Sequence, residues 1–357
     1  AVLDSWKGIS DIIFGQTTDD DIISGSRWVT DQLIENLQRI PGRGNSKVYK
    51  LTTTGGNSYA VKYYPDQTSD KRPRLKTEFN TLKLLHQHHI TNVPKAVEKD
   101  EKLNLGFYEW MKGEPVTAPT PDDLNKAIDF IKKLQLLSRE IGENDIQLAS
   151  EACLSAYDLS HQIEERLQRL QKVSLDSQNT SIFLNDAFIP LLQQVRDESI
   201  CLWPEESRIR DLPRDKQTLS PSDFGFHNCL KASDGSMTFL DFDYFGWDDP
   251  VKLMADFIWH PAMNLRSALR EKWKTAMLRL FACDTYFEER LNAAMPLYGL
   301  RWALIVLNEF LPELAQKRRD AHGLKEYDLE RRQRIQLKKA KQYCDQVKNT
   351  VSQYTFG

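Results

Sequence analysis

Two segments of the sequence carry oxygen-bearing side chains at spacings that suit phosphoryl transfer. The first, LSPSDFGFHNCL, contains Asp223 and Asn228, and the second, TFLDFDYFGWDDP, contains Asp241 and Asp243. In phosphoryl-transfer enzymes one aspartate lies beside the substrate hydroxyl, while an asparagine five residues on and an aspartate on the next strand hold magnesium ions. The pattern predicts Asp223 as the catalytic residue and Asn228, Asp241 and Asp243 as metal ligands.

The stretch between these segments, KASDGSMT, predicts a hairpin turn at residues 234–235. Residues 229–230 and 239–240 would then form two short antiparallel strands, which bring Asn228 and Asp241 together at one end. Aspartate and asparagine also cap turns in loops that have no chemical role. The metal-site interpretation therefore needs support from the rest of the chain.

That support comes from Lys62 in the strand-like run YAVKYY and Glu78 in the helical run PRLKTEFNTLKLLHQH. A strand lysine often lies at a solvated edge. Kinases, however, fix a phosphate-binding lysine with a carboxylate from the next helix. We therefore expect Lys62 to contact the α- and β-phosphates of a nucleotide and Glu78 to orient it.

A loop of small residues precedes the lysine strand: Gly42, Gly44, Asn45 and Ser46. Such a stretch is commonly a plain turn. A loop without bulky side chains can also bring its backbone amides close to phosphate oxygens. Both interpretations stay open, and the position of the loop ahead of Lys62 makes these residues candidates for nucleotide binding.

The sequence pattern predicts three parts. Residues 1–40 form an extension and a helix, with Trp28, Leu33, Ile34 and Leu37 as an apolar stripe. Residues 41–112 alternate strand, strand, helix, strand and strand, and the first pair turns at Gly55-Gly56-Asn57. Residues 113–357 are mostly helical, with helices at about 122–140, 155–173, 182–199, 250–260, 264–294, 296–316 and 325–350.

Composition favours a globular protein that binds small molecules. The chain has 357 residues, 40% of them hydrophobic and 28% charged, enough for one large core or two medium ones. Its five cysteines never form a Cys-x-x-Cys pair, so neither a zinc site nor a disulfide framework is indicated. The formal charge of −3 gives no general attraction to nucleic acid or to anionic membranes.

No stretch reaches the apolar length that a membrane span requires, and the first residues show no signal-peptide pattern. We therefore expect no membrane association and a cytoplasmic location.

Taken together, these motifs resemble the aminoglycoside phosphotransferase and choline kinase superfamily. The similarity runs from about Pro41 to about Glu309 and includes GRGNSKVYKL, YAVKYY, LKTEFNTLKLL, FYEWMKGEPV, SDFGFHN and LDFDYFGWDDPVKLMADF. It implies an α+β, bilobal protein-kinase-like fold with a small β-rich N-lobe and a larger, mostly helical C-lobe. It also implies that Glu109, Trp110 and Met111 form the hinge that holds the nucleotide base.

The resemblance implies a magnesium-dependent kinase that moves the γ-phosphoryl group of ATP or GTP to a hydroxyl of a small metabolite, such as a sugar, an aminoglycoside-like compound or an amino alcohol. One position departs from it, because most members have histidine where this chain has Pro221. A pseudokinase-like scaffold that binds nucleotide and a partner protein is the alternative. A protein kinase is disfavoured, since no Ala-Pro-Glu motif follows Asp241 at activation-segment distance.

The acceptor pocket is expected between Asp223 and the late helices, and the chain is expected to be a monomer or a homodimer. Asp256 is expected to support the catalytic loop by accepting its backbone N–H groups. The residues expected to contact the acceptor are Trp247, Asp248, Trp259, Arg301 and Glu309, with Asp249, His260, Trp302 and Asn308 as further candidates.

Overall fold

The chain folds into two compact units. The computed structural model describes residues 22–23, 33–40, 46–64, 71–142, 146–174, 178–315 and 329–354. Within these ranges, the N-terminal unit contains the residues up to Glu114 together with Leu230–Tyr244, and the helical unit contains the remainder. Among the described residues, none of the helices combines the length and apolar character needed to cross a bilayer.

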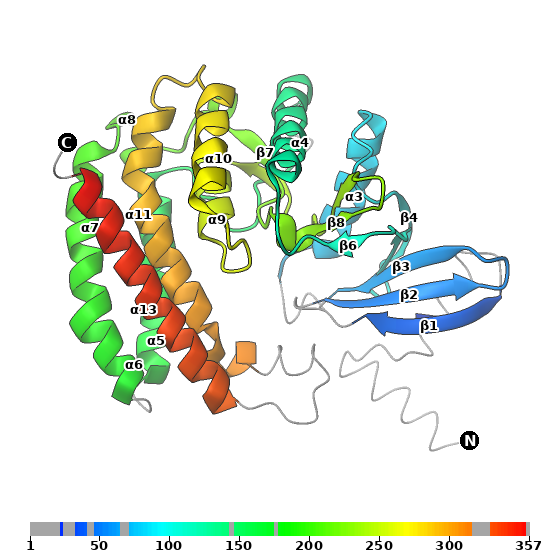
Figure 1. The fold of residues 1–357 in the computed structure, drawn as a ribbon, viewed down its shortest axis with the longest axis horizontal. Helices are drawn as coiled ribbons and strands as arrows, with labels where there is room; N and C mark the ends of the chain where they lie inside the picture. The colour runs from blue at the N-terminus through cyan, green and yellow to red at the C-terminus, as the bar shows by residue number, and fades with distance from the viewer. Residues whose placement is uncertain are drawn as a thin grey trace. The chain divides into compact units, whose positions relative to one another are not determined.

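The N-terminal unit is built on a five-stranded antiparallel sheet with the order β1-β2-β3-β5-β4. In Figure 1 the first three strands lie side by side in blue. Helix α3, Arg74–Gln87, follows β3, as the apolar spacing of that segment predicts. The strands are β1 Ile34–Ile40, β2 Lys47–Thr53, β3 Ser58–Tyr63, β4 Ala96–Asp100 and β5 Leu105–Glu109.

Strand β1 corrects the prediction of a helix before residue 40. Ile34, Leu37 and Ile40 are half-buried at intervals of three, which resembles a helical stripe. The register of β1 against β2 shifts between Ile34 and Asn36. Such a bulge interrupts the two-residue alternation of a strand, so that Ile34 and Leu37 both pack against the same core cluster. Of the other residues of the predicted extension, 22–23 and Leu33 are described, and Leu33, predicted in the apolar stripe, is 69% exposed. The remaining ones lie outside the described ranges.

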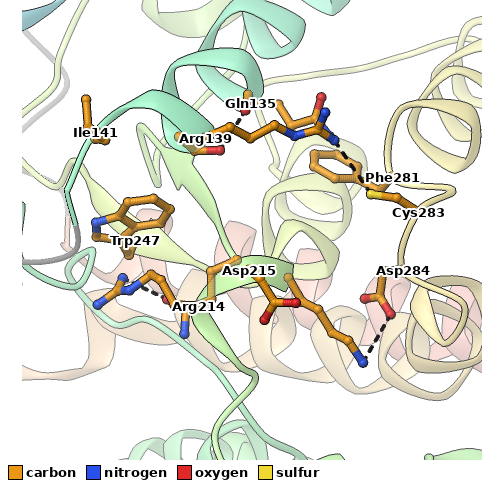
Figure 2. Close-up of a pocket in the computed structure, with 12 residues that line it drawn as sticks. Gln135, Arg139, Ile141, Arg214, Asp215, Trp247, Phe281, Cys283 and Asp284 are labelled. Carbon is orange, nitrogen blue, oxygen red and sulfur yellow. Dashed lines mark hydrogen bonds and ion pairs between the residues drawn. The ribbon is translucent and has the colours of Figure 1, made fainter.

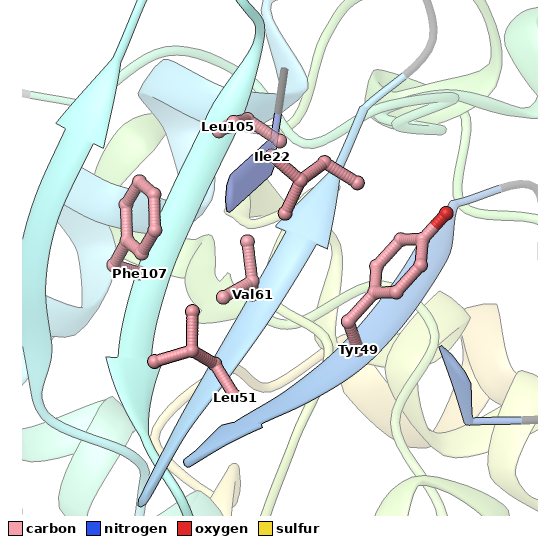
Figure 3. Packing of buried hydrophobic residues seen from close by; sticks show 6 residues of the cluster. All are labelled: Ile22, Tyr49, Leu51, Val61, Leu105 and Phe107. Carbon is pink, nitrogen blue, oxygen red and sulfur yellow. The ribbon is translucent and has the colours of Figure 1, made fainter. Parts of the chain in front are cut away.

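A hydrophobic cluster covers one face of this sheet (Figure 3). Val61 of β3 pairs with Tyr49 of β2 on one side and with Phe107 of β5 on the other, so that the three form a row across the strands. Because successive side chains in a strand point to opposite faces, Lys62 lies on the other face. The cluster consists of Ile22, Tyr49, Leu51, Val61, Leu105 and Phe107.

The predicted hairpins are present. Strands β2 and β3 turn at Gly56, whose φ of 80° suits glycine. Strands β8, Cys229–Lys231, and β9, Met237–Phe239, are neighbours and turn at Gly235, which has a φ of 83°. Strand β6, Glu114–Pro115, is the third member of their sheet.

The helical unit is organised around the buried helix α11, Phe287–Ile305, which packs against α5, α7, α9 and α13. Figure 1 shows α11 and α13 side by side. A two-stranded sheet joins β7, Thr218–Ser220, to β10, Gly246–Asp248. The α-helices are α4 Pro121–Glu140, α5 Ala156–Ser174, α6 Gln178–Ile182, α7 Ile189–Leu202, α8 Glu206–Ile209, α9 Pro250–Trp259, α10 Ser267–Leu280 and α13 Leu329–Tyr354.

Shorter helical turns complete the unit. They are η1 Phe183–Phe188, η2 Arg214–Lys216, η3 Phe226–Asn228 and η4 Val306–Phe310. Helices α4 and α9 are among those that begin with side-chain caps. Thr120 forms a capping box with Asp123 at α4, and Asp249 accepts the backbone N–H of Val251 at α9.

The predicted break between the two late helices at residue 295 is wrong. Helix α10 ends at Leu280, and Pro296 lies inside α11. Proline removes one backbone donor from a helix. Helix α11 nevertheless continues through it, because it is buried along most of its length and tertiary packing outweighs local preference.

Candidate active site

Lys62 and Glu78 form a buried ion pair in the N-terminal unit, the pairing that their positions on a strand and on the following helix predict. Lys62 Nζ lies 2.6 Å from Glu78 Oε2, and the two residues are 9% and 5% exposed. Strand β3 directs Lys62 away from the hydrophobic cluster, and α3 presents Glu78 one turn after Arg74. The amine is therefore fixed in a water-poor environment.

Two aspartates that follow β9 join this pair. Lys62 Nζ lies 2.5 Å from Asp241 Oδ1 and 3.7 Å from Asp243 Oδ2. Arg74 NH1 donates to Asp243 Oδ2 at 3.1 Å. Arg74 is a contact that the sequence analysis missed, although its place four residues before Glu78 on one helix face was a usable signal.

Burial and charge determine the protonation of this cluster. Burial raises the pKa of Asp243, the cations Lys62 and Arg74 act to lower it, and the carboxylates of Asp241 and Glu78 add to the rise, so that this pKa is about 7. Burial acts to lower the pKa of Lys62, but the three carboxylates outweigh it, so that this pKa lies well above its usual value. Lys62 is therefore charged at neutral pH.

The donor set of the cluster fits a magnesium ion. Carboxylate oxygens of Glu78, Asp241 and Asp243 lie within 4.8 Å of one another, and magnesium prefers oxygen ligands. The Asp241 side chain is 36% exposed, whereas those of Glu78 and Asp243 are 6% and 4% exposed. Asp241 is thus the most accessible of these carboxylates to a hydrated cation. That Asn228 shares such an ion stays a prediction.

Two buried tyrosines extend the hydrogen bonding of Glu78, Tyr64 directly and Tyr108 through Tyr64. Tyr64 donates its hydroxyl to Glu78 Oε2 at 2.5 Å, and the hydroxyls of Tyr64 and Tyr108 lie 2.7 Å apart. Lys62 Nζ lies 5.0 Å from the centroid of the Tyr64 ring. The sequence analysis missed both tyrosines. Tyr64 shares a sheet face with Lys62 two residues earlier, which was the available signal.

The predicted hinge ends strand β5. Glu109 is the last residue of that strand and is exposed, while Trp110 and Met111 are half-buried. Lys50 Nζ of β2 lies 5.1 Å from the centroid of the Trp110 ring. Of the predicted phosphate loop, only Ser46 belongs to the described residues, and it is half-buried just before β2. Gly42, Gly44 and Asn45 lie outside them.

In the helical unit, Asp223 lies between β7 and η3 and is surrounded by donors. His227 Nε2 lies 3.0 Å and His260 Nε2 lies 3.7 Å from Asp223 Oδ1. Asn228 Nδ2 donates to the backbone oxygen of Asp223 at 3.0 Å. Burial acts to raise the pKa of Asp223, but the hydrogen bond from His227 and the charges of His227 and His260 hold it well below its usual range.

His227 and His260 form a stacked pair that sequence reasoning did not assemble. Their ring centroids are 3.8 Å apart and their planes differ by 13°. With Asp223 they make up a group whose spacing could hold a metal ion. An imidazole nitrogen binds a metal in its own ring plane, and nearly parallel stacked planes cannot both contain one ion. The stacking therefore argues against a metal ion shared by the two rings, and His227 is within hydrogen-bond distance of Asp223.

The residues expected to contact an acceptor have buried side chains in this structure, and their contact with an acceptor stays a prediction. Asp248 accepts the backbone N–H of Cys153 and pairs with Lys252. Arg301 binds Glu151 at 2.8 Å, and Glu309 binds Arg332 at 3.1 Å. These contacts favour a structural role. The residues concerned, each less than 6% exposed, are Trp247, Asp248, Trp259, Arg301 and Glu309.

Asp256 contacts side chains of helices α9 and α11. It accepts Trp302 Nε1 at 2.7 Å and Arg301 NH1 at 3.4 Å. Its other oxygen lies 3.4 Å from Lys252 Nζ. Support of the catalytic loop by Asp256 stays a prediction.

The helical unit also contains a pocket of about 340 Å³ between α4, η2 and the end of α10 (Figure 2). Arg214 lies over the ring of Trp247 at 4.5 Å and donates to Gln217. Lys216 pairs with Asp284 at 3.8 Å. Trp247 is the one predicted site residue in its lining. Lys216 and Asp284 are the charged pair within this lining, Arg214 and Arg139 contact neutral side chains, and we assign the pocket no role.

Comparison with known proteins gives the family. The model of the phosphotransferase enzyme family matches residues 36–292. Similar solved structures include a spectinomycin phosphotransferase in complex with ADP and spectinomycin, at 12% identity and a TM-score of 0.57, with 90% of this chain and 98% of that chain covered. A choline kinase from Cryptosporidium parvum has 11% identity and a TM-score of 0.57, with 93% and 97% covered.

An ethanolamine kinase from Plasmodium vivax has 13% identity and a TM-score of 0.54, with 90% of this chain and 89% of that chain covered. No curated protein sequence gives a significant match. The structural neighbours establish the protein-kinase-like fold, with a β-rich N-terminal lobe and a helical C-terminal lobe. Since the family model spans most of the sequence, the chain belongs to the phosphotransferase enzyme family.

Proposed function

We propose that this phosphotransferase is a magnesium-dependent kinase that transfers the γ-phosphoryl group of ATP or GTP to a hydroxyl of a small metabolite. The observation that carries the proposal is the buried cluster of Lys62, Glu78, Asp241 and Asp243, in a chain of this family. The structural neighbours named for spectinomycin, choline and ethanolamine support a hydroxyl-bearing acceptor, such as an amino alcohol, an aminoglycoside-like compound or a sugar.

The residues divide the chemistry between them. Lys62, held by Glu78, binds the α- and β-phosphates, and Asp223 accepts a hydrogen bond from the acceptor hydroxyl. The acceptor oxygen forms a bond to the γ-phosphorus as the bond to the bridging oxygen breaks, the hydroxyl proton passes to the Asp223 carboxylate, and the nucleoside diphosphate leaves. Because the pKa of Asp223 is low, its carboxylate is charged at neutral pH and suited to orient the hydroxyl.

Asn228 and Asp241, with Asp243 nearby, are the residues that would hold magnesium. The ion supplies positive charge that neutralises the phosphates. The NH2 group of Asn228 is used on Asp223, which leaves its amide oxygen as the ligand atom. The proposal includes the expectation of a cytoplasmic monomer or homodimer.

A labelling assay tests the proposal. The protein is incubated with γ-labelled ATP or GTP, magnesium and a panel of choline, ethanolamine, sugars and aminoglycosides, and label is sought in the acceptor. The Asp223→Asn variant should lose about 10²- to 10⁴-fold in turnover, as expected when an acid–base group is removed. Unchanged turnover in this variant would refute the assignment of Asp223. Nucleotide binding without any labelled product would favour the pseudokinase-like scaffold.

A further inference from the structure

The residue before Asp223 adopts an unusual backbone conformation. Ser222 has a φ of 67°, and the N–H of Asp223 donates to the carbonyl of Pro221 at 2.9 Å. A three-residue turn with positive φ at its centre is rare and strained. Such a conformation persists where the surrounding structure enforces it, and it commonly marks a functional site.

The polar groups of Ser222 have partners from three segments. Its N–H donates to Ser220 Oγ at 3.0 Å, and its hydroxyl donates to the carbonyl of Ser150 at 3.2 Å. The same hydroxyl oxygen accepts a hydrogen bond from Lys252 Nζ at 3.0 Å. The hydroxyl is thus held between the segment before α5 and helix α9, and the strained turn is anchored through it.

Lys252 is itself fixed. It is 1% exposed, and its Nζ lies 3.0 Å from Asp248 Oδ2 and 3.4 Å from Asp256 Oδ2. Burial acts to lower its pKa, but these two carboxylates outweigh burial and keep the amine charged. Asp248 is held by the backbone N–H of Cys153 at 3.0 Å. A cation with paired carboxylates on two sides is a rigid donor for a third contact.

We propose that Lys252 is a positioning residue for phosphoryl transfer, which holds Asp223 in place through the hydroxyl of Ser222. The proposal rests on the function proposed above. Pro221 has no side-chain donor with which to hold this loop, so the anchor comes from the neighbouring serine. Lys252 acts through Ser222 and not by contact with the acceptor or the nucleotide.

The test removes the anchor but keeps the buried charges paired. In Ser222→Ala the hydroxyl is lost, while Lys252 keeps both carboxylates, so the fold is retained. Ser199→Ala is the matched control, because Ser199 is also buried and its hydroxyl donates to a distant carbonyl, that of Ala293, at 2.8 Å. Thermal unfolding of both variants measures the general effect of losing a buried hydroxyl.

Kinetics then separate positioning from stability. Ser222→Ala should lower kcat by about 10- to 100-fold, because small misplacements of a reacting group are costly. The KM for nucleotide should change by less than about twofold, since nucleotide contacts are untouched. Ser199→Ala should keep the wild-type kcat. Ser222→Gly relieves the strain without restoring the anchor, so it should be at least as impaired as Ser222→Ala.

A spectroscopic measurement tests the positioning role of Lys252 independently of the proposed kinase activity. His227 Nε2 lies 3.0 Å from Asp223 Oδ1, so the ¹⁵N resonance of His227 reports on the position of Asp223. This resonance should shift in Ser222→Ala and stay unchanged in Ser199→Ala. A wild-type protein without phosphoryl transfer would reject the proposed function, and the resonance would still decide the positioning role. Wild-type kcat in Ser222→Gly, or an unchanged His227 resonance in Ser222→Ala, would overturn the proposal.

Discussion

His260 shows how strongly burial acts on single residues near Asp223. Burial and the neighbouring His227 lower its pKa to about 4, against the carboxylates of Asp223 and Asp256. The ordinary value is 6.5, so His260 is neutral at pH 7. The imidazole ring of His260 also packs edge-to-face with the ring of Trp302, and the two centroids are 4.8 Å apart. A neutral imidazole can pack in this apolar position, whereas an imidazolium is disfavoured there.

This shift predicts a pH dependence of stability. Between pH 6.5 and pH 4 the unfolded chain binds a proton at His260 that the folded protein does not bind. Stability from this residue is therefore fully present above pH 6.5 and is lost as the pH falls toward 4, by on the order of 3 kcal/mol at most. Urea unfolding at pH 7 and pH 4.5 should show a smaller loss in His260→Gln than in the wild type.

The exposed His161 provides the control, because its side chain is 54% accessible. The His161→Gln variant should lose as much stability between the two pH values as the wild type does. If His260→Gln and His161→Gln gave the same loss, burial of His260 would not be the cause.

At the scale of elements, strand β5 and helix α3 together position Lys62. Gly106 of β5 pairs with Lys62 across the strands. A Cβ atom at Gly106 would lie 2.7 Å from ring carbons of Tyr108, so the absence of a side chain lets that ring lie back over the strand. From there its hydroxyl reaches Tyr64, which in turn donates to Glu78. The ion pair of Lys62 and Glu78 is thus supported by an aromatic layer that consists of Tyr64 and Tyr108.

Removal of one hydroxyl tests this layer. Tyr64→Phe leaves the ring but removes the donor to Glu78, which should cost about 1 to 3 kcal/mol in unfolding free energy because a buried carboxylate loses a partner. Nucleotide affinity should fall, since Glu78 orients Lys62. Chemical denaturation and nucleotide titration measure the two effects. Tyr157→Phe, at a site that is 60% exposed, should change neither, and an unaffected Tyr64→Phe variant would contradict the role of the layer.

Sequence periodicity predicted most elements but failed where tertiary structure overrides it. The spacing of α3 and the glycines of two hairpins were local signals, and those elements are present. Strand β1 was misread because a bulge places Ile34 and Leu37 on one face. The break predicted at residue 295 was wrong because the depth of burial of α11 does not show in local sequence.

The same limit explains which site contacts were found. Lys62 and Glu78 stand sixteen residues apart on a strand and the next helix, a spacing with a known chemical meaning. Arg74 and Asp243 are separated by 169 residues, and Ser222 and Lys252 by 30. Pairs of this kind depend on how the chain folds back, which neither composition nor periodicity reports. The charges of Arg74, Asp243 and Lys252 by themselves favoured solvent-exposed positions.

At the scale of the whole molecule, the two units divide the predicted roles. The N-terminal unit contains the lysine, its glutamate and the two aspartates that suit nucleotide and magnesium. The helical unit contains Asp223 with its histidines and its anchoring lysine. Nucleotide binding and turnover should therefore respond to different substitutions.

Ligand-induced stabilisation provides the measurement. A ligand that binds only the folded state at 100 times its Kd adds about 2.7 kcal/mol to unfolding free energy. Magnesium and ATP should raise the Tm of the wild type and of Asp223→Asn alike. In Asp241→Ala, Lys62 keeps its 2.6 Å contact with Glu78, so the N-terminal unit should still fold. The variant lacks the accessible carboxylate of Asp241, so the rise in Tm with magnesium and ATP should largely disappear. The opposite pattern, with a rise in Asp241→Ala and none in Asp223→Asn, would mean that nucleotide binding depends on the helical unit and that the N-terminal cluster is only an internal ion-pair network.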